Sequence, residues 1–407
     1  MQVKSFRFNL QELGGALGDL GTLLPLMIAL ILINGLNATS VLLGVGLLYV
    51  VSGLYFRIPT PVQPLKAVAA LAISMGVSGS VIGASGLIIG AILLLLSVTN
   101  LVKVIIRFFP QPVVKGIQLS IGLTLVTKGL DMTFSKDIFI NGASSSSPIQ
   151  FPVGIFLAVA AILVFFLFRF VLSRHSQHFP PSLALLTFGL SSGFAFSGFS
   201  GFAQLSPILP DIALPKAADF WLALTVLVIP QLPLTLGNSV VGTWDTAQTY
   251  FKERACRMTP RALATSLGLA NIAAGLIGAM PMCHGSGGLT AHYKLGARTG
   301  GANLMIGTLF LMAGLLFGAA VLPFFSLIPL AVLGALLIIV GIYHALLVRA
   351  LTAKRDLAVA GMVAAVALLT GNLAYGFAAG ILSYHLISRL PQKGLSSCRV
   401  RDLPPLA

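Results

Sequence analysis

The stretch RIPTPVQPLKAVAALAIS at residues 57–74 has a distant counterpart in GAMPMCHGSGGLTAHYKLG at residues 278–296. Each begins with a Pro-x-Pro or Pro-x-Cys segment that cannot start as helix, and each continues into a segment that can. A helix is therefore expected to begin partway through each stretch. The unpaired N–H groups at such starts attract anions, and two interrupted segments at matching places in a transporter indicate a substrate site near the bilayer midplane. We interpret the chain as an anion carrier.

The composition supports a membrane protein. Of 407 residues, 57% are hydrophobic and 9% are charged, against about 25% charged in an average soluble domain, and the mean hydropathy is +0.98. The net charge of +15 lies in short loops, where it sets topology, so nucleic-acid binding is excluded. Three cysteines with no paired spacing indicate neither a disulfide framework nor a metal site, and no cofactor is expected.

The apolar runs, and the residues that interrupt them, predict an all-α polytopic protein with about fourteen transmembrane segments, in which spans three and ten are broken. The predicted spans are 10–33, 38–56, 58–77, 82–102, 111–130, 151–171, 181–198, 218–241, 260–279, 280–297, 301–321, 327–348, 356–371 and 373–390.

Charge tests this number independently, because lysine and arginine gather in cytoplasmic loops. With both termini inside, 21 of the 25 basic residues fall on the cytoplasmic side and 3 on the outer side, with Lys66 inside a span. This topology makes the two seven-span halves inverted repeats, so the starts of the third and tenth half-helices face each other. We predict a multi-pass protein of the cell (inner) membrane.

Four polar residues of spans one and three are predicted to face the site. A lysine within a membrane is a functional hypothesis by default, and Lys66 either supplies positive charge to an oxyanion or pairs with Asp19; snorkelling to the interface is the third alternative. Gln63 is an amide donor or a helix cap. Asp19, in GDLGT at residues 18–22, is a proton-coupling group or a structural counter-ion. Thr22 offers a hydroxyl or packs in the core.

In span ten, HGSGG at residues 284–288 lets an anion approach the backbone closely. The predicted donors are Ser286 and the amides that include Gly285, Gly287 and Gly288. His284 either hydrogen-bonds to the substrate or titrates during transport. A nucleophilic pair of His284 with the preceding cysteine would make an enzyme, but adjacent residues of an extended segment point to opposite faces, so we expect no enzyme.

Span eight contributes two further amide side chains, Gln231 and Asn238. They either line the site beside the half-helices or hold neighbouring helices together, which is the more frequent role of such groups.

Several motifs resemble the molybdate transporter branch of the sulfate permease superfamily. They are GDLGTLLP at 18–25, PTPVQPLK at 59–66, PMCHGSGGL at 281–289 and GARTG at 296–300. The resemblance spans essentially the whole chain. It implies seven plus seven inverted repeats and uptake of a tetrahedral oxyanion, molybdate first and sulfate second. The cytoplasmic regulatory domain of many sulfate permeases is not expected, because fewer than twenty residues follow residue 390.

The same resemblance implies a division into core and gate. The core would comprise residues 1–110 and 217–325, the gate residues 111–200 and 326–392, and a short cytoplasmic tail residues 393–407. A homodimer is one option for the assembly.

These inferences combine into one mechanism. The oxyanion would sit between the starts of half-helices three and ten, held by backbone amides near Val62–Leu65 and Gly285–Leu289, and the core would move against the gate by alternating access. Proton symport is the simplest source of energy, because an inward-negative potential opposes a dianion. The alternatives are a sulfate permease, a proton-coupled nucleobase symporter and an anion channel.

Overall fold

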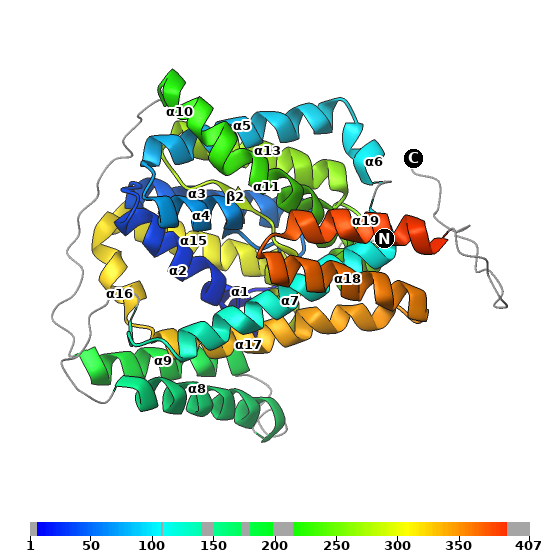
Figure 1. Ribbon diagram of the computed structural model, residues 1–407. Helices are drawn as coiled ribbons and strands as arrows, with labels where there is room; N and C mark the ends of the chain where they lie inside the picture. The colour runs from blue at the N-terminus through cyan, green and yellow to red at the C-terminus, as the bar shows by residue number, and fades with distance from the viewer. Residues whose placement is uncertain (1–5, 107–108, 140–149, 172–179, 198–214, 389–407) are drawn as a thin grey trace.

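The computed structural model describes residues 6–106, 109–139, 150–171, 180–197 and 215–388, and Figure 1 shows their arrangement. The α-helices in chain order are α1 (Leu10–Leu17), α2 (Leu20–Leu32), α3 (Ala38–Phe56), α4 (Lys66–Met75), α5 (Gly79–Val98), α6 (Leu101–Ile106), α7 (Gln111–Thr133), α8 (Gln150–Phe166), α9 (Pro181–Ser197), α10 (Ala217–Leu222), α11 (Ile229–Leu234), α12 (Thr243–Phe251), α13 (Pro260–Leu276), α14 (Ser286–Lys294), α15 (Gly301–Leu316), α16 (Leu322–Ser326), α17 (Leu330–Ala345), α18 (Lys354–Thr370) and α19 (Leu373–Ser388). The strands are β1 (Gln63–Pro64) and β2 (Met282–Cys283).

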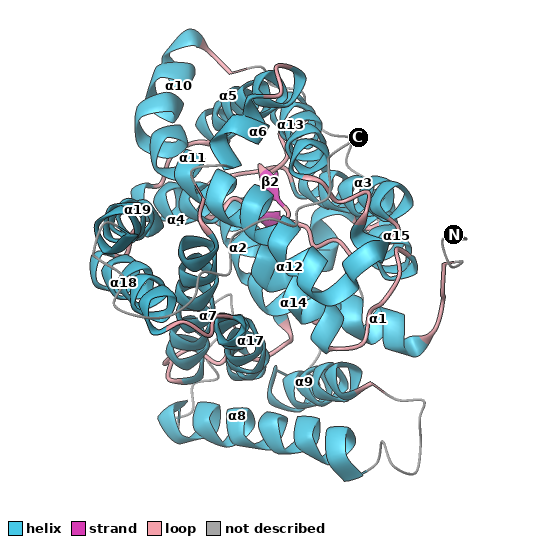
Figure 2. Ribbon diagram, turned by 90° about the vertical axis from the view of Figure 1, so that its right-hand side faces the viewer, coloured by secondary structure: helices cyan, strands magenta, loops and turns pink. Residues whose placement is uncertain are grey.

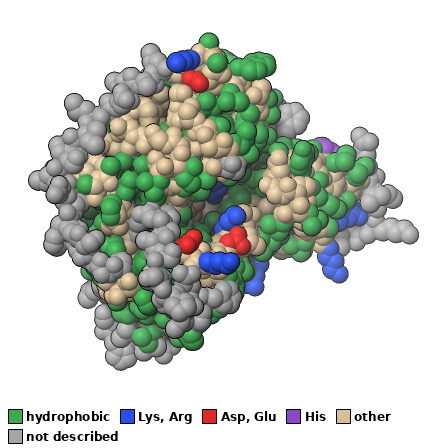
Figure 3. All heavy atoms as spheres, turned by 60° about the vertical axis from the view of Figure 1, so that its left-hand side comes forward, with side chains coloured by type: hydrophobic (Ala, Val, Ile, Leu, Met, Phe, Trp, Pro, Cys, Tyr) green, Lys and Arg blue, Asp and Glu red, His purple; other side chains and the backbone are tan. Residues whose placement is uncertain are grey.

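The exterior is that of a membrane protein. In the described part, six helices are long and apolar enough to cross a bilayer, or up to seven if the bent pair α1 and α2 forms one span. Large apolar side chains such as Leu95, Phe156 and Leu369 are exposed, and hydrophobic side chains are widespread on the face in Figure 3. The fourteen-span count stays a prediction. The predicted tail, residues 393–407, lies outside the described residues.

The two interrupted stretches fold as predicted. Proline fixes the backbone and disfavours helix in the residue before it, and the segment with Pro59, Pro61 and Pro64 stays non-helical until α4 begins at Lys66. The segment after Pro281 stays non-helical until α14 begins at Ser286. Strands β1 and β2 pair antiparallel, and Figure 2 places them near the middle of the helix assembly. Because each strand runs into its helix, α4 and α14 begin at opposite ends of this short ribbon.

The first predicted span, residues 10–33, is also broken, which the sequence analysis did not predict. Helices α1 and α2 meet at a bend of 50°, and Asp19 stands at the N-cap of α2. Glycine lets another segment come very close here: a β-carbon on Gly15 would collide with the backbone of Ala297, and one on Gly18 with Leu295. The bend places the Asp19 carboxylate at a buried helix start and not midway along a continuous helix.

The eighth predicted span, residues 218–241, is longer than predicted, because helix continues to Phe251. It absorbs Pro230 and Pro233 with two π-helical segments, Ala223–Val228 and Thr235–Gly242. Such π segments are frequent at functional sites. The extension carries Asp245 into α12, where it meets α7.

Small residues let three pairs of long helices touch backbone to backbone. A β-carbon on Gly46 or Gly90 would lie 2.8 Å from the carbonyl oxygen of Gly307 or Gly268, joining α3 to α15 and α5 to α13. A β-carbon on Gly129 would lie 2.6 Å from the Gly334 oxygen, which joins α7 to α17. Glycine permits the close approach of the two backbones at each of these crossings.

Candidate functional site

A buried pair of polar side chains marks the centre of the site. Gln63 of β1 donates from its Nε2 to the Oδ1 of Asp19 over 2.6 Å, and the two residues are 1% and 3% exposed. The remaining oxygens, Oδ2 of Asp19 and Oε1 of Gln63, have no hydrogen-bond partner in the described part. Buried acceptors without donors are costly, so this pair is a strained feature that needs a functional explanation. Thr22 lies one turn along α2, with its side chain beside Asp19.

Two glycines of the tenth span make room for this pair. A β-carbon on Gly288 would lie 2.6 Å from Asp19 Oδ2, from Gln63 Nε2 and from Pro61 Cβ, and one on Gly285 would collide with Gln63 Oε1. The half-helix α14 therefore begins directly against the carboxylate and the carboxamide. The structure brings together Asp19, Gln63 and the glycines that the sequence analysis had assigned to one site.

A side-chain oxygen of Asn238 lies at the start of α14. The Oδ1 of Asn238 accepts from the backbone N–H of Ser286 over 3.2 Å and from its hydroxyl over 2.6 Å. A side-chain oxygen that receives two donors at a helix start occupies the position of an oxyanion oxygen. Among the described residues, the NH₂ group of Asn238 has no hydrogen-bond acceptor, and it lies 3.7 Å from where a β-carbon on Gly285 would be.

Two more donors at this helix start are free. The first N–H groups of a helix have no partner within the helix, and the structure gives no acceptor to those of Gly287 and Gly288 among the described residues. Both residues are buried, so water does not compensate them as it does at an exposed helix start. An anion with several oxygens can satisfy such a cluster.

The start of α4 is arranged similarly but is more fully occupied. The Oε1 of Gln231 accepts from the N–H of Ala67 over 2.8 Å and of Val68 over 3.2 Å. The predicted donors near Val62–Leu65 need correction, because the N–H of Leu65 already donates to Pro281 over 3.0 Å. The carbonyl of Val62 accepts from the Tyr49 hydroxyl, which ties Val62 to α3, and the donor role of its N–H stays a prediction.

Lys66 stands at the first position of α4 and is half-buried. It is near enough to Asp19, Cys283 and His344 for electrostatic interaction with each. The predicted ion pair with Asp19 does not form, because the ion pairs within the described ranges are Lys115–Asp245 and Lys128–Asp131. The ammonium of Lys66 thus stays available at the site.

His284 turns away from the site. Its Nδ1 lies 2.8 Å from the carbonyl oxygen of Pro61, and its Nε2 lies 3.0 Å from the hydroxyl of Ser266 on α13. A carbonyl only accepts, so Nδ1 carries the proton and Nε2 accepts from Ser266. With both nitrogens used by the protein, His284 fastens the two interrupted segments together and has no nitrogen left for a substrate.

His344 of α17 reaches the site from the side and was missed by the sequence analysis. It is fully buried; its Nε2 lies 3.1 Å from Ser286 Oγ and its Nδ1 lies 2.8 Å from Thr290 Oγ1. Because the Ser286 hydroxyl donates to Asn238, it must accept from His344 Nε2–H, and Nδ1 then accepts from Thr290. The signal was available, since an ionisable residue inside an apolar span is a functional hypothesis.

A second polar contact joins α7 to α12. Lys115 Nζ lies 2.7 Å from Asp245 Oδ2, with the side chains 3% and 12% exposed. Gln118 donates to the same oxygen over 2.8 Å, and Gln111 donates to Oδ1 over 3.2 Å. Three side chains of one helix thus converge on a single carboxylate of another.

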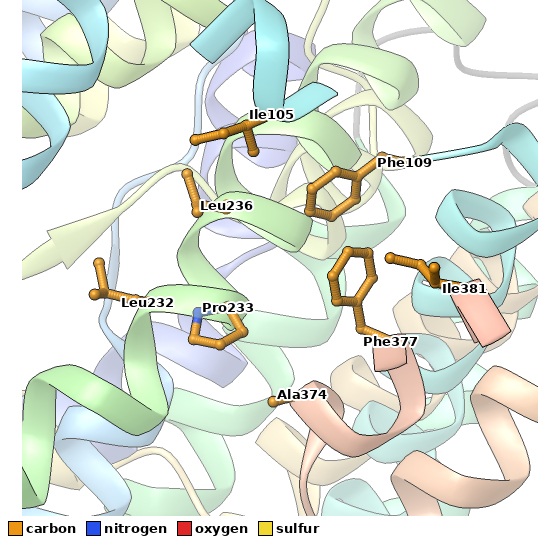
Figure 4. Close-up of a pocket in the computed structure, with 8 residues that line it drawn as sticks. All are labelled: Ile105, Phe109, Leu232, Pro233, Leu236, Ala374, Phe377 and Ile381. Carbon is orange, nitrogen blue, oxygen red and sulfur yellow. The ribbon is translucent and has the colours of Figure 1, made fainter. Parts of the chain in front are cut away.

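Apolar side chains separate the eighth span from α19. A cavity of about 450 Å³ is lined by Phe109, by Leu232 and Leu236 of the eighth span, and by Phe377 and Ile381 of α19. These side chains point toward a common space in Figure 4. Phe109 and Phe377 stack with ring centroids 4.3 Å apart. This boundary has no polar side chain in its lining, in contrast to the contacts of Asp245 and His344.

Solved structures define the fold. The chain matches the transmembrane domain of the cyanobacterial bicarbonate transporter BicA with a TM-score of 0.56 and 18% identity, covering 92% of this chain and 96% of that one. It matches SLC26A9 with a TM-score of 0.62 and 15% identity, covering 95% and 66%. The protein therefore has the helical membrane-transporter fold that BicA and SLC26A9 share.

Sequence comparisons define the family. A family model described as "Molybdate transporter of MFS superfamily" matches residues 11–125 and 223–343. Molybdate transporter 2 of Arabidopsis thaliana is 32% identical over 92% of this chain and 87% of its own length. Molybdate transporter 1 of the same plant is 31% identical over 98% and 92%, and molybdate transporter 1 of Chlamydomonas reinhardtii is 29% identical over 91% and 90%. The chain belongs to this molybdate transporter family, so it is a multi-pass membrane transporter of an anion and not an enzyme.

Proposed function

We propose that the protein imports a tetrahedral oxyanion, molybdate first and sulfate second, by alternating access. The anion would sit between the starts of α4 and α14, where the N–H groups of Gly287 and Gly288 and the ammonium of Lys66 replace its water. The names of the curated relatives support molybdate as the ion. Tungstate and sulfate are dianions of the same shape, and they are tested alongside it.

The observation that carries the proposal is the position of the Asn238 oxygen on both donors of Ser286. We infer that this oxygen occupies the position of an oxyanion oxygen in the absence of substrate. A substrate oxygen would displace it from the Ser286 donors. The carboxamide then turns its free NH₂ group toward the anion. The hydroxyl of Ser286 changes its acceptor from a neutral amide to a charged oxygen, which makes the stronger hydrogen bond.

Asp19 is proposed to couple transport to protons. A dianion that enters against 100 mV, inside negative, pays about 4.6 kcal/mol, and a carboxylate beside the start of α14 adds repulsion. Protonation of Asp19 removes that charge. If its Oδ1–H then donates to the oxygen of Gln63, the Gln63 carboxamide turns over and directs its NH₂ group to the side of Gly285. The 2.6 Å separation suits an O–H···O hydrogen bond, and Lys66 and Tyr49 are the other titratable groups that face Asp19.

The division into core and gate is proposed to follow the predicted ranges, with α7 and α17 as the gate helices nearest the site. His344 of α17 and Lys115 of α7 then make the polar contacts to the core, and the cavity beside Phe377 is an apolar sliding surface. Polar contacts have discrete geometries and apolar ones do not, so movement of the core breaks the first and slides over the second. The polar contacts between gate and core that are formed in a given state would therefore determine which side of the membrane the site opens to.

We propose that both termini are cytoplasmic in the cell (inner) membrane, as predicted. The predicted seven plus seven inverted repeats have support in the packing. Under that repeat, spans two, four and five correspond to spans nine, eleven and twelve. The packing of α3 on α15 then corresponds to that of α13 on α5, and α7 packs on its own counterpart α17. The packing of α8 on α9 likewise corresponds to that of α18 on α19.

Uptake by proteoliposomes tests the proposal. Purified protein should take up radiolabelled molybdate with saturation, tungstate should compete best, sulfate less and uracil not at all. Competition by uracil would favour the nucleobase symporter, and non-saturating flux would favour a channel. Asn238→Ala and Ser286→Ala should each weaken apparent affinity about tenfold or more, because each removes a hydrogen bond to a charged oxygen. If an imposed pH gradient does not change the uptake rate, Asp19 does not couple transport to protons.

A further inference from the structure

A second cavity, distinct from the anion site, lies between α3 and α13. Its volume is about 600 Å³. Leu47, Leu48 and Val51 of α3 form one wall, Leu269 and Ala270 of α13 belong to the other, and Met282 of β2 also lines the cavity. We define this cavity as the α3/α13 groove. Leu47, Val51 and Leu269 are 52%, 51% and 58% exposed, so the groove opens to the surroundings of the protein, which for a multi-pass membrane protein is lipid.

The groove has a charged side chain at one end only. Arg261, Thr259 and Tyr55 lie at that end, where α13 begins and α3 finishes. Arg261 is the one charged residue of the lining. Within the described residues its guanidinium has no hydrogen bond or ion pair, and the hydroxyl groups of Tyr55 and Thr259 donate to no acceptor. A cation and two hydroxyl groups that donate to no acceptor stand at the mouth of a mostly apolar channel.

We propose that the α3/α13 groove binds one chain of an anionic phospholipid, with the headgroup phosphate at Arg261. Charge complementarity selects this occupant, because the groove carries one positive group and no carboxylate. The dimensions agree. From residue 261 to residue 277, α13 rises by roughly 24 Å, which exceeds the hydrocarbon depth of one leaflet, about 15 Å, so an acyl chain fits along it. Arginine matches phosphate with paired N–H groups.

The groove wall is connected to the substrate site. Ser266 lines the groove and hydrogen-bonds to His284 over 3.0 Å. Asn271 on the same helix donates to the Met282 carbonyl over 2.9 Å and accepts from its N–H over 2.7 Å. A lipid in the groove therefore packs against the helix that holds β2 and the segment leading into α14. The bound lipid would stabilise α13, the helix that holds β2 and His284 by hydrogen bonds.

Lipid retention measures the site without depending on transport. The protein is reconstituted into nanodiscs with equal amounts of phosphatidylglycerol and phosphatidylcholine of matched chains, re-extracted in mild detergent, and the retained lipid is quantified by mass spectrometry. We expect phosphatidylglycerol to be enriched about fivefold, the factor that corresponds to about 1 kcal/mol for one arginine near an anionic lipid. Arg261→Gln should abolish the enrichment, and Arg349→Gln, an exposed arginine outside the groove, should preserve it.

A second variant fills the groove itself. Ala270→Phe should lower the retained amount of both lipids, whereas Gly361→Phe, at a site with no atom within 4 Å of a new β-carbon, should not. Equal retention of the two lipids by the unaltered protein, or undiminished enrichment in Arg261→Gln, would overturn the proposal. Inorganic phosphate at millimolar concentration should leave the total amount of retained lipid unchanged, because the acyl chain supplies most of the binding. Since no substrate is present, failure here is separate from failure of the proposed transport.

Discussion

Replacing Gly288 by alanine gives the sharpest test of the site. The new β-carbon would lie 2.6 Å from three atoms, Asp19 Oδ2, Gln63 Nε2 and Pro61 Cβ. Non-bonded atoms prefer about 3.5–4.0 Å, so the Asp19–Gln63 pair must move by about 1 Å. Overpacking of this kind costs about 1–3 kcal/mol, and alanine returns about 1 kcal/mol through its helix propensity. The net loss of stability is therefore small, and the main effect is a change in the geometry of the Asp19–Gln63 pair.

Gly287 supplies the matched control on the same turn. A β-carbon there would meet the ends of two flexible side chains, Leu125 Cδ1 at 3.1 Å and Ile121 Cγ2 at 3.7 Å. Both can shift by a few tenths of an ångström. Gly287→Ala should thus transport within about twofold of the unaltered protein and unfold at the same or a slightly higher temperature, given the helix propensity gained.

The assay is molybdate uptake by proteoliposomes at equal protein density, with thermal unfolding in detergent measured in parallel. Gly288→Ala should unfold within a few degrees of the unaltered protein and lose about tenfold or more of its transport rate. If it fails to fold, Gly288→Ala combined with Gln63→Ala relieves part of the clash and should recover stability but not transport. Normal uptake by Gly288→Ala, or an equal loss in Gly287→Ala, would refute the placement of the site.

Three further changes probe the charges and the gate. Lys115→Met should cost up to about 3–5 kcal/mol because it leaves the largely buried Asp245 carboxylate without its counter-ion. The double change Lys115→Met, Asp245→Leu should recover most of the unfolding temperature, and an additive double variant would contradict this. His344→Ala should lower the transport rate about tenfold, while equilibrium binding of molybdate changes less than threefold. His344→Gln should restore part of the rate. Equal losses in binding and rate would place His344 in the binding site itself. Lys66→Gln should weaken equilibrium binding of molybdate about tenfold or more, because hydrogen bonds to charged groups contribute about 1.5–3 kcal/mol; unchanged affinity would remove Lys66 from the site.

The local features of the site could be predicted from the sequence, because they depend on residues that are close along the chain. Prolines at 59, 61, 64 and 281 stop helix formation, and α4 and α14 begin where these constraints end. Glycines at 285 and 288 allow a close approach, and the structure has Gln63 and Asp19 in that space. These are rules of backbone geometry that act over a few residues.

The partners of the charged and polar groups could not be predicted in this way. Charge alone pairs Asp19 with Lys66, but the bend at the start of α2 brings Asp19 to Gln63 instead. His284 stands beside the glycines in the sequence, yet tertiary packing turns it to Ser266 and Pro61. His344 lies 58 residues from Ser286. The rule that drew attention to Lys66 applies equally to His344 and Lys115, and applying it throughout would have found both.

The two half-helix starts are related but not equivalent, and this difference fits a carrier of one small anion. At α4, Gln231 holds two of the amides and its own NH₂ group is bound to Thr235, so this end is fixed. At α14, Asn238 holds one amide and leaves two amides and an NH₂ group free. A tetrahedral anion cannot satisfy two complete helix starts at once. Because Gln231 accepts from the first N–H groups of α4, those groups are not available to an anion. In the proposal, the ammonium of Lys66 supplies the positive charge at this end instead. In the proposed mechanism, the α14 end would adapt its donors to the anion, and the α4 end would set the distance of the anion from the ribbon.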